Sequence, residues 1–200
     1  MNTAVSINLG SLPSLSDLFA HLHAGKHLNR LAQHALWAEL EQEQAQYTAL
    51  FAALGFDLRI DGRGFAWFHF EEGSAAVSKT TRQLALLFML IFEFKADAGA
   101  HLSRFTDWRI DNDLLLGLLE KHQMLLAAEN LADIDQLKQL MRSAATYGFA
   151  TSEDAHWFLL PAVFRYLDRF EELAHRNPSE MDALVDEAPE GDDGAQEGTA

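Results

Sequence analysis

Residues 54–70 read LGFDLRIDGRGFAWFHF, and this stretch decides the fold because it has the pattern of a β-hairpin. Apolar and charged residues alternate along 56–61, which is the period of a half-buried strand. The DGRG sequence at 61–64 supplies turn chemistry, since its two glycines can adopt positive φ at no steric cost. The returning arm, 65–70, is aromatic on both faces. Helices flank this two-stranded ribbon in the sequence, so we expect a winged-helix module with 54–70 as its wing.

Helical patterns lie on both sides of the predicted hairpin. Upstream, a helix is expected from a cap at Ser14 to Gly25. A second helical stretch is expected to begin near Asn29 or Arg30 and to reach Gly55, with a break in its polar segment, residues 42–46. Downstream, Ser74 or Ser78 is expected to cap a third helix that runs to about Ala96.

The centre of this third helix, residues 84–92, is apolar on every side and is therefore expected to be buried all round. It is either a central core helix or a core helix with one face in a dimer interface. We favour the second interpretation, because two small modules rarely enclose a helix completely. Phe88 and Phe92 are the candidate dimer contacts.

The second half of the chain repeats this order of elements. The segment Asp111-Asn112-Asp113 is placed to cap one helix and Asp133 to open another, and an aromatic arm follows a polar turn at 151–154. Pro161 can start a last helix that ends near His175. The expected fold is mostly α with small β-hairpins, in tandem winged-helix domains at residues 14–97 and 98–176. Residues 177–200 are expected to form a disordered acidic tail.

Composition and charge limit the function. The 200 residues are 48% hydrophobic and include no cysteine, which excludes disulfides, thiolate metal sites and a cysteine nucleophile. No secretory signal is visible, and the longest apolar run, nine residues at 84–92, is too short to cross a bilayer. The net charge is −15, and residues 177–200 hold eight acidic and no basic residues, which leaves −7 on the body. We therefore expect a cytoplasmic protein without a membrane partner, in which any contact with nucleic acid is local.

Four short motifs resemble one known family. They are LHAGKHL at 22–28, YTALFAALGF at 47–56, DGRGF at 61–65 and RQLALL at 82–87. In this order they resemble bacterial condensin subunits of the MksE/MukE group, and the resemblance covers roughly residues 15–95. Chain length and the acidic tail favour MksE over MukE. Beyond residue 95 only the order of helices and wings agrees, so the kleisin-facing residues of the family cannot be carried over.

The resemblance implies a tandem winged-helix protein that forms a homodimer and binds a kleisin subunit (MksF-like). The kleisin in turn bridges to an SMC ATPase (MksB-like), in a nucleoid-associated complex that acts in chromosome organisation, segregation or plasmid defence. An unpaired wing edge or an inter-domain groove could take a kleisin segment. Trp157 and Phe158, on the second aromatic arm, are the candidate kleisin anchors, although both could be core residues.

An enzyme is not expected. The sequence has no phosphate-binding Gly-rich loop and no nucleophile elbow. His21, His23, His27 and His34 lie within fourteen residues, but Gly25 interrupts the helical spacing and no carboxylate stands where a metal site needs one. We expect neither a metal nor a cofactor.

Contact with non-specific double-stranded DNA is the more serious possibility, since winged helices hold phosphates with Lys and Arg. The candidate DNA contacts are Lys26, Arg30, Arg59, Arg63, Lys79 and Arg82. The competing interpretation is a solvated surface in which nearby acidic residues cancel these charges. A free-standing winged-helix transcription regulator is the alternative function. It should carry a strongly basic recognition helix, but residues 42–54 have no Lys or Arg and residues 134–147 have two.

Overall fold

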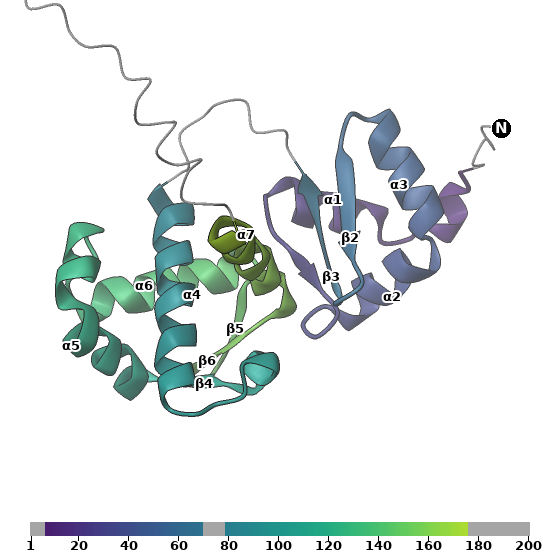
Figure 1. Ribbon diagram of the computed structural model, residues 1–200. Helices are drawn as coiled ribbons and strands as arrows, with labels where there is room; N and C mark the ends of the chain where they lie inside the picture. Colours follow the sequence, from purple (N-terminus) through teal and green to yellow (C-terminus); the bar gives the residue numbers. More distant parts are fainter. Residues whose placement is uncertain (1–6, 70–78, 176–200) are drawn as a thin grey trace, which may run out of the picture. The chain divides into compact units, whose positions relative to one another are not determined.

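A computed structural model describes residues 7–69 and 79–175 (Figure 1). We call residues 7–69 the first module. Its elements are a 3-10 turn η1 (Leu9–Ser11), α1 (Leu15–His23), β1 (Leu28–Asn29), α2 (His34–Gln42), α3 (Gln44–Ala53), β2 (Asp57–Asp61) and β3 (Phe65–His69). The helical break predicted within residues 42–46 is confirmed, because Glu43 separates α2 from α3.

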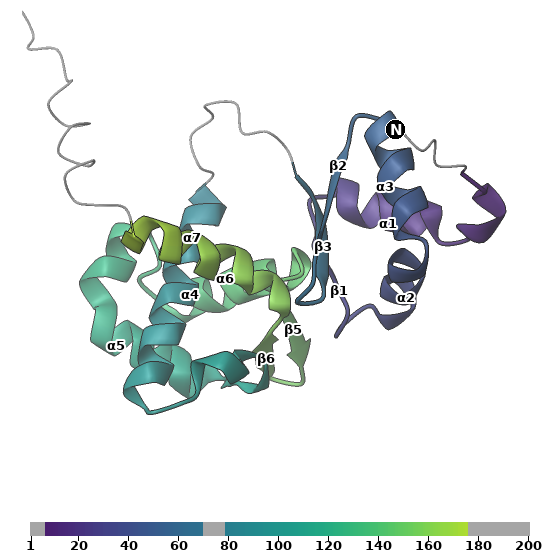
Figure 2. The ribbon, with the colours of Figure 1, turned by 45° about the vertical axis from the view of Figure 1, so that its right-hand side comes forward.

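The hairpin predicted from residues 54–70 is confirmed as β2 and β3, which pair in antiparallel register from Asp57↔His69 to Asp61↔Phe65. The sheet nevertheless has three strands in the order β1-β3-β2, with β3 in the middle (Figure 2). The prediction of a helix from Asn29 or Arg30 is wrong, since Leu28 and Asn29 pair with β3 and α2 starts only at His34.

The core of the first module lies between its helices and one face of this sheet. Its buried residues are Leu12, Leu18, Leu22, Leu28, Trp37, Leu40, Tyr47, Phe51, Leu58, Ala66 and Phe68. A carboxylate joins the three helices at the edge of this core. Glu39 of α2 accepts hydrogen bonds from the Ser14 backbone N–H at 3.0 Å and from the Tyr47 hydroxyl at 2.5 Å. The Ser14 side chain makes no capping hydrogen bond, so its predicted capping role is replaced by this backbone contact.

We call residues 79–163 the second module. Its elements are α4 (Lys79–Asp97), η2 (Leu102–Asp107), β4 (Arg109–Ile110), α5 (Asn112–Ala128), α6 (Ile134–Thr146), β5 (Ala150–Glu153), β6 (His156–Leu159) and η3 (Pro161–Val163). The strand order is β4-β6-β5, so the strand that precedes the helix pair again joins the returning arm of the hairpin. The predicted mostly α fold with small antiparallel sheets is confirmed.

The two predicted helix caps of this module are confirmed. The Asp111 side chain accepts from Leu114 N–H at 3.0 Å, and Asp133 accepts from Gln136 N–H at 2.8 Å within a capping box. Both carboxylates accept hydrogen bonds from first-turn backbone N–H groups that have no partner within the helix. Their negative charge also interacts favourably with the positive end of the helix dipole. The helix α5 is kinked at His122, whose φ and ψ are −123° and 29°.

The helix α4 packs against α5, α6 and η2. These contacts favour a place in the second module, whereas the predicted domain boundary after residue 97 puts α4 in the first; the boundary itself stays a prediction. Within the single chain the centre of α4 is not buried all round, because Met89 is 43% exposed. Whether a second copy of the chain covers this side stays a prediction. Its predicted cap, Ser74 or Ser78, lies outside the described residues.

The two modules can be aligned at one residue pair. In each module the second helix of the pair ends in a glycine with positive φ followed by phenylalanine: Gly55-Phe56 with φ 84°, and Gly148-Phe149 with φ 80°. The phenylalanine N–H donates 2.8 Å bonds to Phe51 O in the first module and to Ala144 O in the second. The repeated order of elements therefore extends to the helix-to-hairpin turn.

The last described helix, α7 (Phe164–His175), begins three residues after the Pro161 predicted as its start, because Pro161 opens the 3-10 turn η3 instead. Within α7, Arg169 pairs with Glu172 at 2.9 Å and the rings of Tyr166 and Phe170 lie 6.5 Å apart. The predicted acidic tail lies outside the described residues.

Candidate functional site

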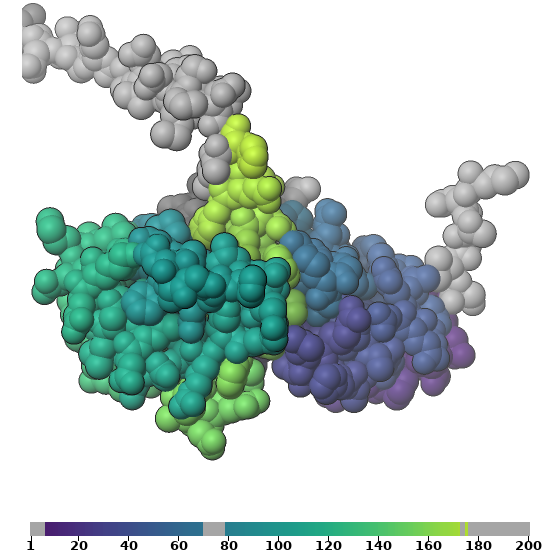
Figure 3. Space-filling view, turned by 60° about the horizontal axis from the view of Figure 1, so that its bottom comes forward, coloured from purple at the N-terminus to yellow at the C-terminus, as the bar shows by residue number. Residues whose placement is uncertain are grey.

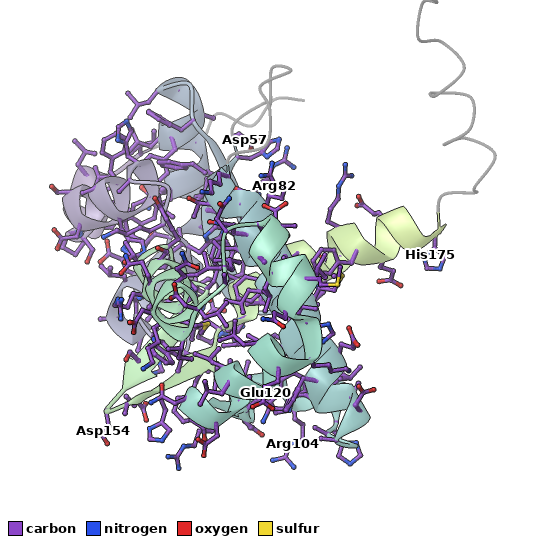
Figure 4. All side chains as sticks on the ribbon, turned by 90° about the vertical axis from the view of Figure 1, so that its left-hand side faces the viewer. Asp57, Arg82, Arg104, Glu120, Asp154 and His175 are labelled. Atoms are coloured by element: carbon purple, nitrogen blue, oxygen red, sulfur yellow. The ribbon has the colours of Figure 1, made fainter. Side chains whose placement is uncertain are left out.

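The six basic residues predicted to contact DNA fall into two groups in the structure. In the first group an acidic side chain holds the guanidinium: Arg59 with Asp57 at 2.7 Å, Arg63 with Asp61 at 2.7 Å, and Arg82 with Glu129 at 2.9 Å. The second group is Lys26, Arg30 and Lys79, for which residues 7–69 and 79–175 provide no acidic partner within 4.0 Å. Figure 4 shows Arg82 near the start of α4 and Asp57 at the start of β2.

Arg63 is the most constrained of the paired cations. The hydrogen bonds from Arg63 lower the pKa of Asp61, against a smaller opposing effect of burial, so this carboxylate stays charged at neutral pH. The guanidinium carbon also lies 4.3 Å from the ring centre of Phe164 and 5.7 Å from that of Phe65. A cation held by a carboxylate and by aromatic faces is anchored in the fold, so Arg63 has less charge to offer to a phosphate.

Arg30 offers more. Its side chain is exposed, and its guanidinium carbon lies 5.4 Å from the Trp37 ring centre. Both residues line a cavity of about 230 Å³ between the α2–α3 pair and the β2–β3 turn, together with Leu40, Glu41, Gln44, Ile60, Asp61 and Gly62. The carboxylates of Glu41 and Asp61 in the lining oppose the binding of an anion inside this cavity.

The candidate dimer contacts have partners inside the chain. Phe88 is fully buried and its ring lies 5.9 Å from that of Phe149. Phe92 is half-buried, 5.3 Å from the ring of Phe105 and 4.9 Å from that of Trp108. Their role in a dimer stays a prediction, and substitutions at either position perturb the core of the second module.

The candidate kleisin anchors lie on β6. Trp157 pairs with Ile110 of β4 and with Ser152 of β5, while Phe158 beside it is half-buried. Each predicted wing keeps one outer edge, on β2 or β5, whereas its aromatic arm, β3 or β6, is the central strand of its sheet. Free backbone groups lie instead on the outer strands, and Asp154 at the tip of the β5–β6 hairpin points away from the module (Figure 4). Whether these two residues bind a kleisin stays a prediction.

Three of the four clustered histidines, His21, His23 and His27, have structural partners. The His23 ring contacts those of Phe19 and Phe56 at 5.2 and 5.6 Å. The Nε2 atom of His21 lies 3.1 Å from the carbonyl oxygen of His27, and since a carbonyl only accepts, this nitrogen carries the proton. Within residues 7–69 and 79–175, no group of three or more His, Cys, Asp or Glu side chains could hold a metal ion.

Sequence reasoning missed a contact between the two modules at which the buried polar residues His27 and Asn29 lie. We call it the joint, and define it as His27 and Asn29 of the first module with Tyr147, Gly148 and Ala162 of the second. Both His27 and Asn29 are buried, at 4% and 0% exposure. The surfaces of residues 7–69, purple to blue, and of the teal to green second module adjoin in Figure 3.

Hydrogen bonds connect the two sides of the joint. His27 donates from its backbone N–H at 2.9 Å and from its Nδ1 at 3.0 Å to the same acceptor, Tyr147 O. The amide of Asn29 donates to Gly148 O at 2.8 Å and to His27 O at 3.2 Å, while its Oδ1 accepts from Ala162 N–H at 3.3 Å. These partners fix the orientation of the amide, since exchanging its nitrogen and oxygen would place acceptor against acceptor.

The comparison with protein families decides which protein class this fold belongs to. The family described as "condensin complex protein MksE" matches residues 13–171, most of the chain. The chain belongs to the MksE family. The match confirms the resemblance drawn from the four motifs and extends it across both modules, beyond the residues that carried it. It makes the chain a condensin-like complex subunit.

No curated protein matches the chain in a sequence comparison. Within the described residues, no helix of this MksE family member is both long enough and apolar enough to span a membrane.

Proposed function

We propose that this chain is a non-catalytic subunit of a bacterial SMC complex, which forms a homodimer and binds an MksF-like kleisin. Through the kleisin it associates with an MksB-like ATPase and acts at the nucleoid, in chromosome segregation or in plasmid defence. The observation that carries the proposal is the match to the MksE family over residues 13–171.

The architecture supports a scaffolding role. Each module repeats the order helix, short strand, helix pair and hairpin, which is the order of a winged helix. The arrangement gives two outer strands in each sheet, and outer strands can accept an extended partner segment through backbone hydrogen bonds. The sheets are small, so side-chain anchors such as Phe158 would have to supply most of the specificity.

DNA contact is the secondary part of the proposal. Its candidate contacts are Lys26, Arg30 and Lys79, which have no acidic partner among residues 7–69 and 79–175, and the paired Arg59, Arg63 and Arg82 are expected to add less. A few phosphate contacts give weak, non-specific and salt-sensitive binding. A free-standing transcription regulator is less well supported, since α3 holds no Lys or Arg and Arg142 of α6 is hydrogen-bonded to Gln139.

Co-expression tests the proposal. The full chain should co-purify with the kleisin-like and ATPase subunits encoded in its own genome, and light scattering should give two copies of the chain per complex. Failure to bind any such kleisin would overturn the proposal, and a monodisperse monomer at micromolar concentration would remove the homodimer from it. A chain that ends at Asn177 is the matched variant, and loss of binding only in that variant would move the contact to residues 178–200.

A further inference from the structure

We infer that the joint locks the two modules into one rigid block, so that their relative arrangement is set by buried contacts between them before any partner binds. The residues that carry the lock are His27, Asn29 and Gly148. This inference does not rest on the proposed function, because it concerns the isolated chain.

The backbones of the two modules approach each other closely at Gly148 and His27. A β-carbon built on Gly148 would lie 2.3 Å from the carbonyl oxygen of His27 and 3.1 Å from its backbone nitrogen and carbonyl carbon. Real β-carbons do not approach a backbone atom this closely, and neither backbone can yield as the end of a flexible side chain could. The first module therefore fits against the second only because residue 148 has no side chain.

Directional hydrogen bonds from the Asn29 side chain also connect the two modules. Asn29 is fully buried, and each of its three side-chain hydrogen bonds has a partner, two of them in the second module. Turning the first module away from the second would leave Gly148 O, Ala162 N–H and the Asn29 amide without these partners in an apolar setting. Buried polar groups that lose their partners are costly, so the joint has one favoured geometry.

Aromatic packing surrounds this polar centre. The His27 ring lies 4.4 Å from that of Phe149, and the Phe149 ring lies 5.9 Å from that of Phe88 in α4. The joint is thus continuous with the core of the second module, and water has little room to replace its hydrogen bonds.

The repeated turn offers a matched control. Gly55 has nearly the same φ as Gly148, 84° against 80°, and the same place between a helix and a hairpin. A β-carbon on Gly55, however, would meet nothing within 4 Å. Gly148→Ala and Gly55→Ala therefore impose similar backbone strain, and only Gly148→Ala adds the collision between modules.

The experiment measures the arrangement of the modules in the full chain. Because the chain has no cysteine, Thr48→Cys on α3 and Glu120→Cys on α5 would be the only two thiols, and both positions are exposed. Spin labels there report the distance between modules by double electron–electron resonance. We expect one narrow distance distribution in the parent chain and in Gly55→Ala, and a shifted or several-fold broader one in Gly148→Ala.

A second variant covers the case in which Gly148→Ala does not fold. Asn29→Asp keeps the shape of the side chain and turns its amide donor into an acceptor that faces Gly148 O and His27 O. It should broaden the distribution while circular dichroism retains the helical signal. A broad distribution in the parent chain would overturn the inference. So would a folded Gly148→Ala or, failing that, an Asn29→Asp chain whose distribution matches that of Gly55→Ala.

Discussion

Replacing Tyr47 with phenylalanine removes one hydroxyl from the carboxylate that joins the helices of the first module. The Tyr47 ring is fully buried, and its hydroxyl donates to Glu39 Oε1 at 2.5 Å. A hydrogen bond to a charged group contributes about 1.5–3 kcal/mol to stability. Glu39 keeps its bonds from Ser14 N–H, at 3.0 and 3.2 Å, so we expect a loss near the lower end of that range.

The pH dependence of this loss identifies its cause. Burial raises the pKa of Glu39, but the hydrogen bonds from Ser14 and Tyr47 outweigh it and lower the pKa below the ordinary 4.5. A carboxyl group whose pKa is lower in the folded state than in the unfolded state stabilises the fold. Its full contribution is present at pH values above the unfolded-state pKa, and it is lost as the pH falls through the folded-state pKa. Tyr47→Phe weakens that depression, so the difference in stability between parent and variant should be largest at neutral pH and should shrink in acid.

Urea unfolding at pH 7 and at about pH 3.5 measures both quantities. Tyr147→Phe is the control, because Tyr147 is 39% exposed and its hydroxyl has no hydrogen-bond partner among residues 7–69 and 79–175. We expect its effect to stay within about 0.5 kcal/mol at both pH values. An equal loss for Tyr47→Phe at the two pH values would refute the charge-assisted bond and leave only a packing defect.

Two further predictions concern the second module and DNA. Asp111→Ala should cost about 1 kcal/mol of unfolding free energy, since it removes the acceptor for Leu114 N–H, whereas Asp113→Ala in the same first turn should cost less in the same urea titration. For DNA, Arg30→Gln should reduce the slope of log affinity against log salt by about 0.9, the contribution of one phosphate contact. Arg59→Gln should change that slope less because Asp57 already holds its guanidinium, and equal changes in the two variants would contradict this ranking.

Local signals in the sequence predicted much of the fold. The alternation along 56–61 and the DGRG turn identify β2 and β3, because strand period and turn chemistry are set by adjacent residues. Asp111 and Asp133 mark helix starts for the same reason, since a cap contacts backbone only two or three residues away. The MksE-like motifs carried the family assignment.

Contacts between distant residues could not be predicted in this way. The strand β1 has two residues, too few to show a period, and it exists only because β3 lies beside it. The joint depends on His27 meeting a carbonyl group 120 positions away, and no neighbour in the sequence marks it. The all-round apolar pattern of 84–92 likewise does not indicate that Met89 is the residue left exposed within the single chain, because composition carries no information on which neighbours cover each side of a helix.

The short strand β1 has a consequence for how the chain folds. Its Leu28 pairs with Ala66, and in the second module Ile110 pairs with Trp157. Each pairing closes a loop that contains a whole helix pair and half of the hairpin, so it carries an entropic penalty that the local helices and turns do not. The two hairpins can form early in folding. The strands β1 and β4 can pair with β3 and β6 only after the elements between them have formed.

Asn29 lies on one of these late strands. Its amide can reach Gly148 and Ala162 only after β1 has joined its own sheet and the turn that ends α6 has formed. The two modules are therefore expected to dock last in folding, after both sheets are complete. In a ribosome-bound chain whose second module is still unfinished, His27 and Asn29 lack the partners that bury them in the finished protein.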